Sequence, residues 1–159
     1  MLAELISNSK MPLIIFNFLF PFSIYIDGND YKAGDNLLFN GVMLSDVPNF
    51  GFIVGYTNAS WTLKADIAAL YFTKLLNYMK DNGITRVIPK DTSTGMEYKK
   101  WDGGLTSGYI SRATKDFPYQ GDADPWAGGR NYLVDLFNLY VKKFSLDSLE
   151  FTSSNKKSQ

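Results

Sequence analysis

Short strands are predicted in the first third of the chain from alternating or clustered apolar positions. Ile24 and Ile26 alternate with more polar neighbours, and turn-forming residues follow at 27–30, a pattern typical of a β-hairpin. A further apolar stretch is interrupted at Gly41. The run FGFIV at 50–54 is uniformly apolar and follows a Pro-Asn turn, so a short buried strand is predicted there.

A long helix is predicted over 60–80, directly after that strand. Its apolar residues cover two adjacent faces at helical spacing, so we expect it to be buried on several sides. Asn58 or Ser60 can cap its start, and Gly83 is well placed to end it in a left-handed conformation. The first apolar face comprises Trp61, Ala65, Ala68, Phe72, Leu75, Leu76 and Met79; the second comprises Leu63, Ile67, Leu70 and Tyr71; the polar stripe comprises Asp66, Thr73, Lys74, Asn77 and Lys80.

The second half of the chain is predicted to contain two strands and a helix around a polar excursion. ITRVIP at 84–89 reads as a strand closed by its proline. The polar, turn-rich segment 91–104 is predicted to be a surface loop, and 107–121 to hold a short helix. A clearer helix follows within 122–144, and a last strand with a polar tail begins near 149. The apolar face of that helix would comprise Tyr132, Leu133, Leu136, Phe137, Tyr140 and Val141.

Composition narrows the chemistry open to the chain. Its 159 residues suffice for one domain, and 45% apolar residues favour a packed core over disorder. Lys+Arg and Asp+Glu balance at 16 each, without a basic stripe, which argues against nucleic-acid binding. Cysteine and histidine are both absent, which excludes disulfides, thiol nucleophiles, the usual zinc sites and Ser-His-Asp catalysis within this chain.

The apolar run at 11–25 has three interpretations. It is shorter than the about 20 residues that a spanning helix needs, and Asn17 and Pro21 interrupt it. The start of the chain also lacks the positive charge and the small-residue cleavage site of a signal peptide. A buried strand or an unmatched start is therefore favoured over membrane contact or a signal-like segment, and we expect a cytoplasmic protein.

Two further patterns are predicted to carry no chemistry. The glycine pairs at 103–104 and 128–129 lack the spacing of a phosphate loop and are interpreted as turns. The carboxylate pairs lie in turn-like sequence, where aspartate is common for backbone reasons, so no catalytic residue and no metal ligand is assigned. These pairs are Asp27 with Asp30, Asp122 with Asp124, and Asp147 with Glu150.

The stretch GYTNASWTLKAD, residues 55–66, carries the strongest functional signal. It joins the buried strand to the helix through small polar residues. Free N–H groups at a helix start carry partial positive charge, which suits a phosphate or the electron-rich carbonyl edge of a flavin ring. The alternative is that Asn58 and Ser60 only cap the helix while Trp61 belongs to the core.

The segment 41–83, GVMLSDVPNFGFIVGYTNASWTLKADIAALYFTKLLNYMKDNG, resembles the C-terminal flavin-domain segment of FAD-containing, Baeyer–Villiger-type monooxygenases. The nearest subgroup is that of the bacterial ethionamide-activating monooxygenase. Later pieces, GYISRA, FPYQG, PW and NYLVDL, are similar in the same order, so the resemblance covers nearly the whole chain. It implies an α/β fold, namely an incomplete C-terminal remnant of a flavoprotein with two dinucleotide-binding domains. One long buried helix would follow a short strand, and a helical tail would end the chain.

The resemblance also implies boundaries and residue roles. Residues 1–22 would be an unmatched apolar N-terminus, 23–90 the last segment of the FAD-binding domain and 91–159 a C-terminal extension. The cofactor-binding residues would be Thr57, Asn58, Ala59, Ser60, Trp61 and Thr62, with Tyr56 and Leu63 at the substrate pocket. Full-length members use FAD and NADPH to oxygenate a ketone or a sulfur or nitrogen atom. Both glycine fingerprints are missing from this sequence, so we expect the chain alone to bind neither cofactor.

Three functional hypotheses follow. The first is a C-terminal monooxygenase fragment, inactive alone, from a truncated or frameshifted reading frame. The second is one half of a split enzyme that assembles with a separately encoded N-terminal flavoprotein piece. The third is a small membrane-associated, non-enzymatic protein held by its apolar N-terminus. The substrate is not readable from this segment.

Overall fold

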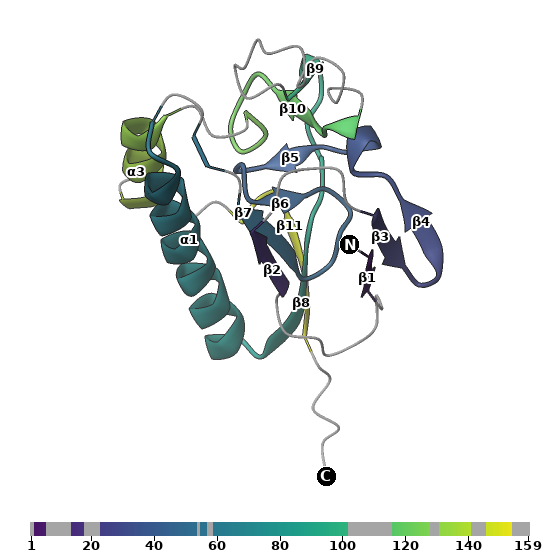
Figure 1. Cartoon of the computed structure of the whole chain (residues 1–159). Helices are drawn as coiled ribbons and strands as arrows, with labels where there is room; N and C mark the ends of the chain where they lie inside the picture. Colours follow the sequence, from purple (N-terminus) through teal and green to yellow (C-terminus); the bar gives the residue numbers. More distant parts are fainter. Residues whose placement is uncertain are drawn as a thin grey trace.

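The computed structural model describes residues 2–5, 14–17, 23–53, 55–56, 59–101, 116–127, 131–140 and 146–153. Within this part, helices α1 (Trp61–Asp81) and α3 (Tyr132–Tyr140) lie together on one side of a set of short strands (Figure 1). The strands form several small sheets of two or three strands each. The predicted mixture of helix and strand is confirmed.

Strands β1 (Leu2–Leu5), β2 (Ile14–Asn17), β3 (Ser23–Ile26) and β4 (Asn29–Tyr31) occupy the N-terminal part. The predicted hairpin is confirmed, because β3 and β4 pair antiparallel across a turn in which Asp27 and Gly28 have φ values of 51° and 79°. The apolar run contributes β2, which pairs in parallel with β7 (Phe50–Ile53), and β1 pairs in parallel with β3. Neither helix in the described part of the chain is long and apolar enough to cross a membrane.

Strands β5 (Leu38–Phe39) and β6 (Met43–Leu44) form a tight hairpin. The apolar stretch that is interrupted at Gly41 forms this hairpin, and Val42 lies in its turn, where Asn40 and Gly41 have positive φ. The Phe52 amide donates to the Val42 carbonyl oxygen at 2.9 Å, so β7 has a neighbour on the edge away from β2.

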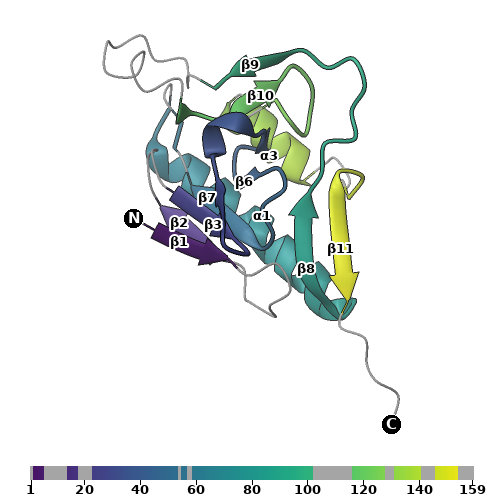
Figure 2. The same cartoon turned by 90° about the vertical axis from the view of Figure 1, so that its right-hand side faces the viewer.

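Strand β8 (Ile84–Pro89) pairs antiparallel with β11 (Leu149–Ser153), and Figure 2 shows the two side by side. Both strands were predicted. The loop prediction for 91–104 is wrong at β9 (Tyr98–Lys100), and β10 (Tyr119–Gly121) occupies the end of the segment predicted to hold a short helix. Neither strand has an apolar run. Backbone hydrogen bonds hold them to the rest of the chain, for example from the Tyr119 amide to the Asn36 carbonyl at 2.7 Å.

Helix α1 begins and ends within one residue of its prediction, and Gly83 follows with a φ of 63°, the left-handed conformation that glycine tolerates best. One face packs on the strands. A Cβ added at Gly51 in β7 would lie 2.4 Å from the Phe72 ring, which shows how closely helix and strand approach. The buried residues recur at three- and four-residue spacing: Lys64, Ile67, Ala68, Tyr71, Phe72, Leu75 and Met79.

The prediction that α1 is buried on several sides is wrong. Trp61, Leu70 and Leu76 are 38%, 38% and 42% exposed, whereas the predicted polar stripe is exposed throughout. Strands β7 and β8 and helix α3 are the main described elements against α1, and they leave parts of both apolar faces uncovered.

The core draws on both halves of the chain. Trp126, from the C-terminal part, is 1% exposed and meets the Phe39 ring edge-to-face with centroids 5.2 Å apart. Trp126 and Leu149 belong to the same buried cluster as the inner face of α1. The segments 23–90 and 91–159 therefore share a hydrophobic core.

Candidate functional site

The helix entrance, residues 59–63, comprises the two residues before α1 and the first three residues of the helix. Ala59 and Ser60 are exposed, and Ser60 occupies the N-cap position predicted for it, with φ −58° and ψ 133°. Its side chain makes no capping hydrogen bond; instead its Oγ lies 2.8 Å from Oγ1 of Thr62. The first amide groups of α1 are therefore not covered by the cap side chain.

Trp61 packs back onto Gly55. A Cβ added at Gly55 would lie 2.2 Å from the indole Cδ2, so the ring fits only over a glycine. With 38% of its surface exposed, Trp61 is not a core residue, and the alternative that placed it in the core is wrong. One edge of the helix entrance is thus a partly open aromatic surface.

The remaining predicted site residues differ in exposure. Thr62 is exposed, Leu63 is half-buried, and Tyr56 is buried with 8% exposure. Thr57 and Asn58 lie outside the described residues. The described members of the predicted site are brought together by chain continuity, but the Tyr56 side chain turns inward while Ala59, Ser60 and Thr62 face solvent.

The inward side of the site is a polar cluster that we call the Asp135 network, made of Tyr56, Lys64 and Asp135. Asp135 Oδ2 accepts a hydrogen bond from Tyr56 Oη at 2.6 Å and another from Lys64 Nζ at 2.7 Å. Lys64 Nζ also lies 3.4 Å from the Asn40 carbonyl oxygen and 5.4 Å from the centre of the Tyr56 ring. Tyr56 and Lys64 therefore meet at a carboxylate that lies 79 and 71 residues further along the chain.

Burial decides the electrostatics of this network. The side chains of Lys64 and Asp135 are only 4% and 13% exposed, so each charge needs the other to compensate for lost hydration. Burial, and then the hydrogen bond to Asp135, raise the pKa of the Tyr56 hydroxyl well above its usual range. Tyr56 therefore remains a proton donor to the carboxylate across the physiological range.

Neither Lys64 nor Asp135 was among the predicted site residues. The sequence does contain one indication that Lys64 is buried, because it precedes Ile67 and Ala68 by three and four residues and so shares their apolar face. A charged residue on a buried helix face requires a partner of opposite charge. The partner itself, 71 residues away, has no local signature.

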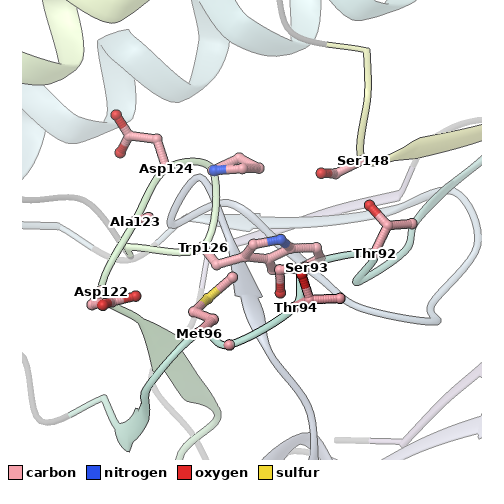
Figure 3. A pocket seen from close by; sticks show the side chains of 11 residues that line it. Thr92, Ser93, Thr94, Met96, Asp122, Ala123, Asp124, Trp126 and Ser148 are labelled. Carbon is pink, nitrogen blue, oxygen red and sulfur yellow. The ribbon is translucent and has the colours of Figure 1, made fainter.

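A separate cavity of about 310 Å³ lies between the segments 92–96 and 122–126, with Ser148 at its rim (Figure 3). None of the described residues between 55 and 64 lines it. Figure 3 shows the Asp122 and Asp124 carboxylates apart from each other, and Asp124 accepts a 3.3 Å hydrogen bond from Asn138. In the described part of the chain no cluster of three or more acidic residues could hold a metal ion.

Comparison with known proteins shows which proteins this chain resembles. Over about four-fifths of its length the chain is homologous to FAD-containing monooxygenases, which confirms the predicted resemblance. It is 46% identical over 126 residues to "Probable FAD-binding monooxygenase AlmA" from Acinetobacter baylyi, a match that covers 79% of this chain. It is 38% identical over 126 residues to "FAD-containing monooxygenase EthA" from Mycobacterium tuberculosis, again covering 79% of this chain.

The corresponding EthA from Mycolicibacterium smegmatis is 37% identical over 130 residues, which cover 82% of this chain. The chain spans about a quarter of the length of these relatives, from 25% to 26%. No protein-family model matches the chain, and no solved structure matches it significantly.

Proposed function

We propose that this chain is the C-terminal, flavin-facing segment of an FAD- and NADPH-dependent monooxygenase of the Baeyer–Villiger or heteroatom-oxygenating type. One observation carries the proposal: an uncapped helix start with small exposed residues follows a buried strand, in a chain homologous to FAD-containing monooxygenases. Helix starts of this kind bind electron-rich groups.

The residues present fit a flavin at the helix entrance. Ala59 and Ser60 are small and exposed, no cap side chain covers the first amides, and Trp61 offers a partly open aromatic edge. Bound FAD would supply the redox chemistry. The chain would bind and orient the ring through residues 57–62, with Leu63 and the backbone of Tyr56 toward the substrate, a ketone or a sulfur or nitrogen compound.

Alone, this polypeptide is proposed to hold neither FAD nor NADPH and to be inactive. Its sequence contains neither glycine fingerprint, and it spans about a quarter of the length of its relatives. Tight binding of FAD requires protein groups that bind its phosphates as well as groups that contact its ring. We propose only ring contacts for this chain.

A second candidate is a split enzyme completed by an N-terminal flavoprotein piece. Helix α3 favours it, because Leu133, Phe137 and Tyr140 are 73%, 54% and 62% exposed and form one apolar stripe at spacings of four and three residues. The membrane-associated alternative has less support, since the apolar N-terminal run contributes β2 to the pairing with β7.

Complementation tests the proposal. The chain would be produced alone and together with the N-terminal three quarters of an AlmA relative, and FAD content and NADPH consumption would be measured for both samples. We expect stoichiometric FAD only in the complemented sample, its loss in Ala59→Arg, and its retention in the control Asn77→Arg, which changes an exposed residue of α1. Tight FAD binding by the chain alone would overturn the inactivity, and FAD unaffected by Ala59→Arg would overturn the site.

A further inference from the structure

We infer that Asp135 is a positioning residue that fixes the helix entrance from both of its ends. As a statement about flavin binding this rests on the function proposed above, whereas the geometry itself does not. The inference assigns to the C-terminal helix α3 a role in shaping the site that the resemblance places at residues 57–62.

Two residues that flank the entrance in sequence bind the same carboxylate. Tyr56 stands before residues 59–63 and Lys64 stands directly after them, and both side chains bind the same oxygen, Asp135 Oδ2, at 2.6 Å and 2.7 Å. A single carboxylate thus holds one side chain on each side of residues 59–63. Holding these two side chains reduces the conformations open to residues 59–63.

Burial makes this restraint strong. Hydrogen bonds to charged groups gain strength where water is excluded, and the side chains of Lys64 and Asp135 are 4% and 13% exposed. Lys64 Nζ also lies near the Asn40 carbonyl oxygen, which joins the network to the β5–β6 hairpin. The entrance is therefore held against two other parts of the fold.

The packing of α3 also bears on the role of Asp135. None of its nine residues is buried, and its large apolar residues Leu133, Phe137 and Tyr140 face outward. Leu139 packs against the core cluster, and polar contacts add to this: besides Asp135, the Leu139 carbonyl accepts from Lys74 Nζ at 2.6 Å, and Asn138 donates to Asp124. Asp135 thus contributes a largely buried charged contact in a helix that has no fully buried residue.

Amide hydrogen exchange of the whole chain tests the inference; within 59–63 the readout is the Leu63 amide, which donates to the Ser60 carbonyl oxygen at 3.2 Å and is therefore protected. In Asp135→Ala, loss of hydrogen bonds to a charged group should accelerate exchange at the entrance on the order of tenfold to a hundredfold. Asn138→Ala is the matched control, because it removes a polar contact of the same helix that does not reach the entrance; its exchange at 59–63 should change by less than about twofold. Because Asp135→Ala also lowers the global unfolding free energy, the variant is compared with wild type in enough urea to give the same unfolding free energy; equal exchange at Leu63 in these two samples would mean that only global destabilisation occurs and would overturn the inference.

A second variant covers the case in which Asp135→Ala does not fold. Lys64→Met combined with Asp135→Leu removes both charges, and replacing both partners of a buried ion pair with apolar residues commonly preserves stability. We expect its urea midpoint to be well above that of Asp135→Ala while exchange at 59–63 stays accelerated. If entrance exchange returns to the wild-type rate, the pair only stabilises the fold and the positioning role is wrong.

Flavin protection separates this inference from the proposed function. In the complemented protein, FAD should slow exchange at 59–63. Faster exchange in Asp135→Ala without protection by FAD would leave the positioning role intact and overturn the flavin site. Protection by FAD together with unchanged exchange in Asp135→Ala would support the flavin site and overturn the positioning role.

Discussion

Two ion pairs of nearly equal length lie in opposite environments. Lys64 and Asp135 are 2.7 Å apart with side chains 4% and 13% exposed, whereas Lys90 and Asp46 are 2.6 Å apart with side chains 42% and 52% exposed. Attraction and the cost of lost hydration both grow with burial. Breaking the buried pair on one side leaves an uncompensated charge, while either partner of the exposed pair can return to water. The environment, and not the distance, determines what a mutation does.

Removal of Asp135 should have the largest effect. In Asp135→Ala, Lys64 is left buried without its carboxylate partner, and the free energy of unfolding should fall by about 3–5 kcal/mol. Urea denaturation at pH 7, followed by circular dichroism, measures this loss. A decrease below about 1 kcal/mol would show that the lysine finds water or another acceptor, which would remove the contrast between the two pairs.

Local sequence patterns predicted the elements whose signals are local. The start and end of α1 follow from its apolar periodicity and from Gly83, and the β3–β4 hairpin follows from Asp27 and Gly28. Strand β9 has the sequence YKK, which contains no apolar run, so its pairing with β10 depends on hydrogen bonds between segments about 20 residues apart.

Long-range consequences were not predictable in this way. Periodicity found the apolar side of α3 but not that Leu133, Phe137 and Tyr140 would remain exposed, because a pattern does not show what packs against it. Lys64 and Asp135 are 71 residues apart, and only the fold brings them together. At the candidate site, the position of the N-cap residue was predictable, whereas the absence of its capping bond and the network behind it were not.

Tyr56→Phe should have an intermediate effect on the unfolding free energy. The pH dependence of that effect tests the buried network further. Loss of one hydrogen bond to a buried carboxylate should lower the unfolding free energy by about 1–2 kcal/mol at pH 7. Burial first, then the Asp135 hydrogen bond, raise the pKa of Tyr56 above its ordinary value of 10.0. A pKa raised on folding stabilises the protein fully below pH 10 and progressively less above it, because only the unfolded tyrosine then loses its proton.

The measurement is the urea midpoint between pH 8 and pH 11. Wild type should lose stability above pH 10, to which Tyr31 and Tyr71, whose pKa values burial also raises, contribute. Tyr56→Phe should lose less over the same interval. Parallel curves for the two proteins would mean that Tyr56 is not held protonated by the network.

Replacing both charges should cancel most of the largest effect. Lys64→Met with Asp135→Leu places apolar groups beside Ile67 and Ala68 and removes the uncompensated charge, so the remaining loss should be about 1–2 kcal/mol, which comes from the missing Tyr56 hydrogen bond. Urea denaturation of the double variant beside both single variants measures the coupling between the two positions. If the double variant is as unstable as Asp135→Ala, the loss of unfolding free energy comes from the missing Tyr56 hydrogen bond and not from the uncompensated charge.

The exposed pair should give the smallest effect. Lys90 Nζ donates to Asp46 Oδ1 across the surface, and solvent screens an attraction between side chains that are 42% and 52% exposed. Lys90→Ala should therefore lower the unfolding free energy by at most about 0.5 kcal/mol, and roughly 0.5 M NaCl should abolish that difference.

Lys90 is the appropriate partner to replace, because Asp46 has a φ of 63° and a substitution there would also change backbone strain. Lys80→Ala, on the exposed side of α1, is the control for removing a surface lysine. A loss above about 2 kcal/mol in Lys90→Ala that persists in salt would show that exposure does not separate the two pairs.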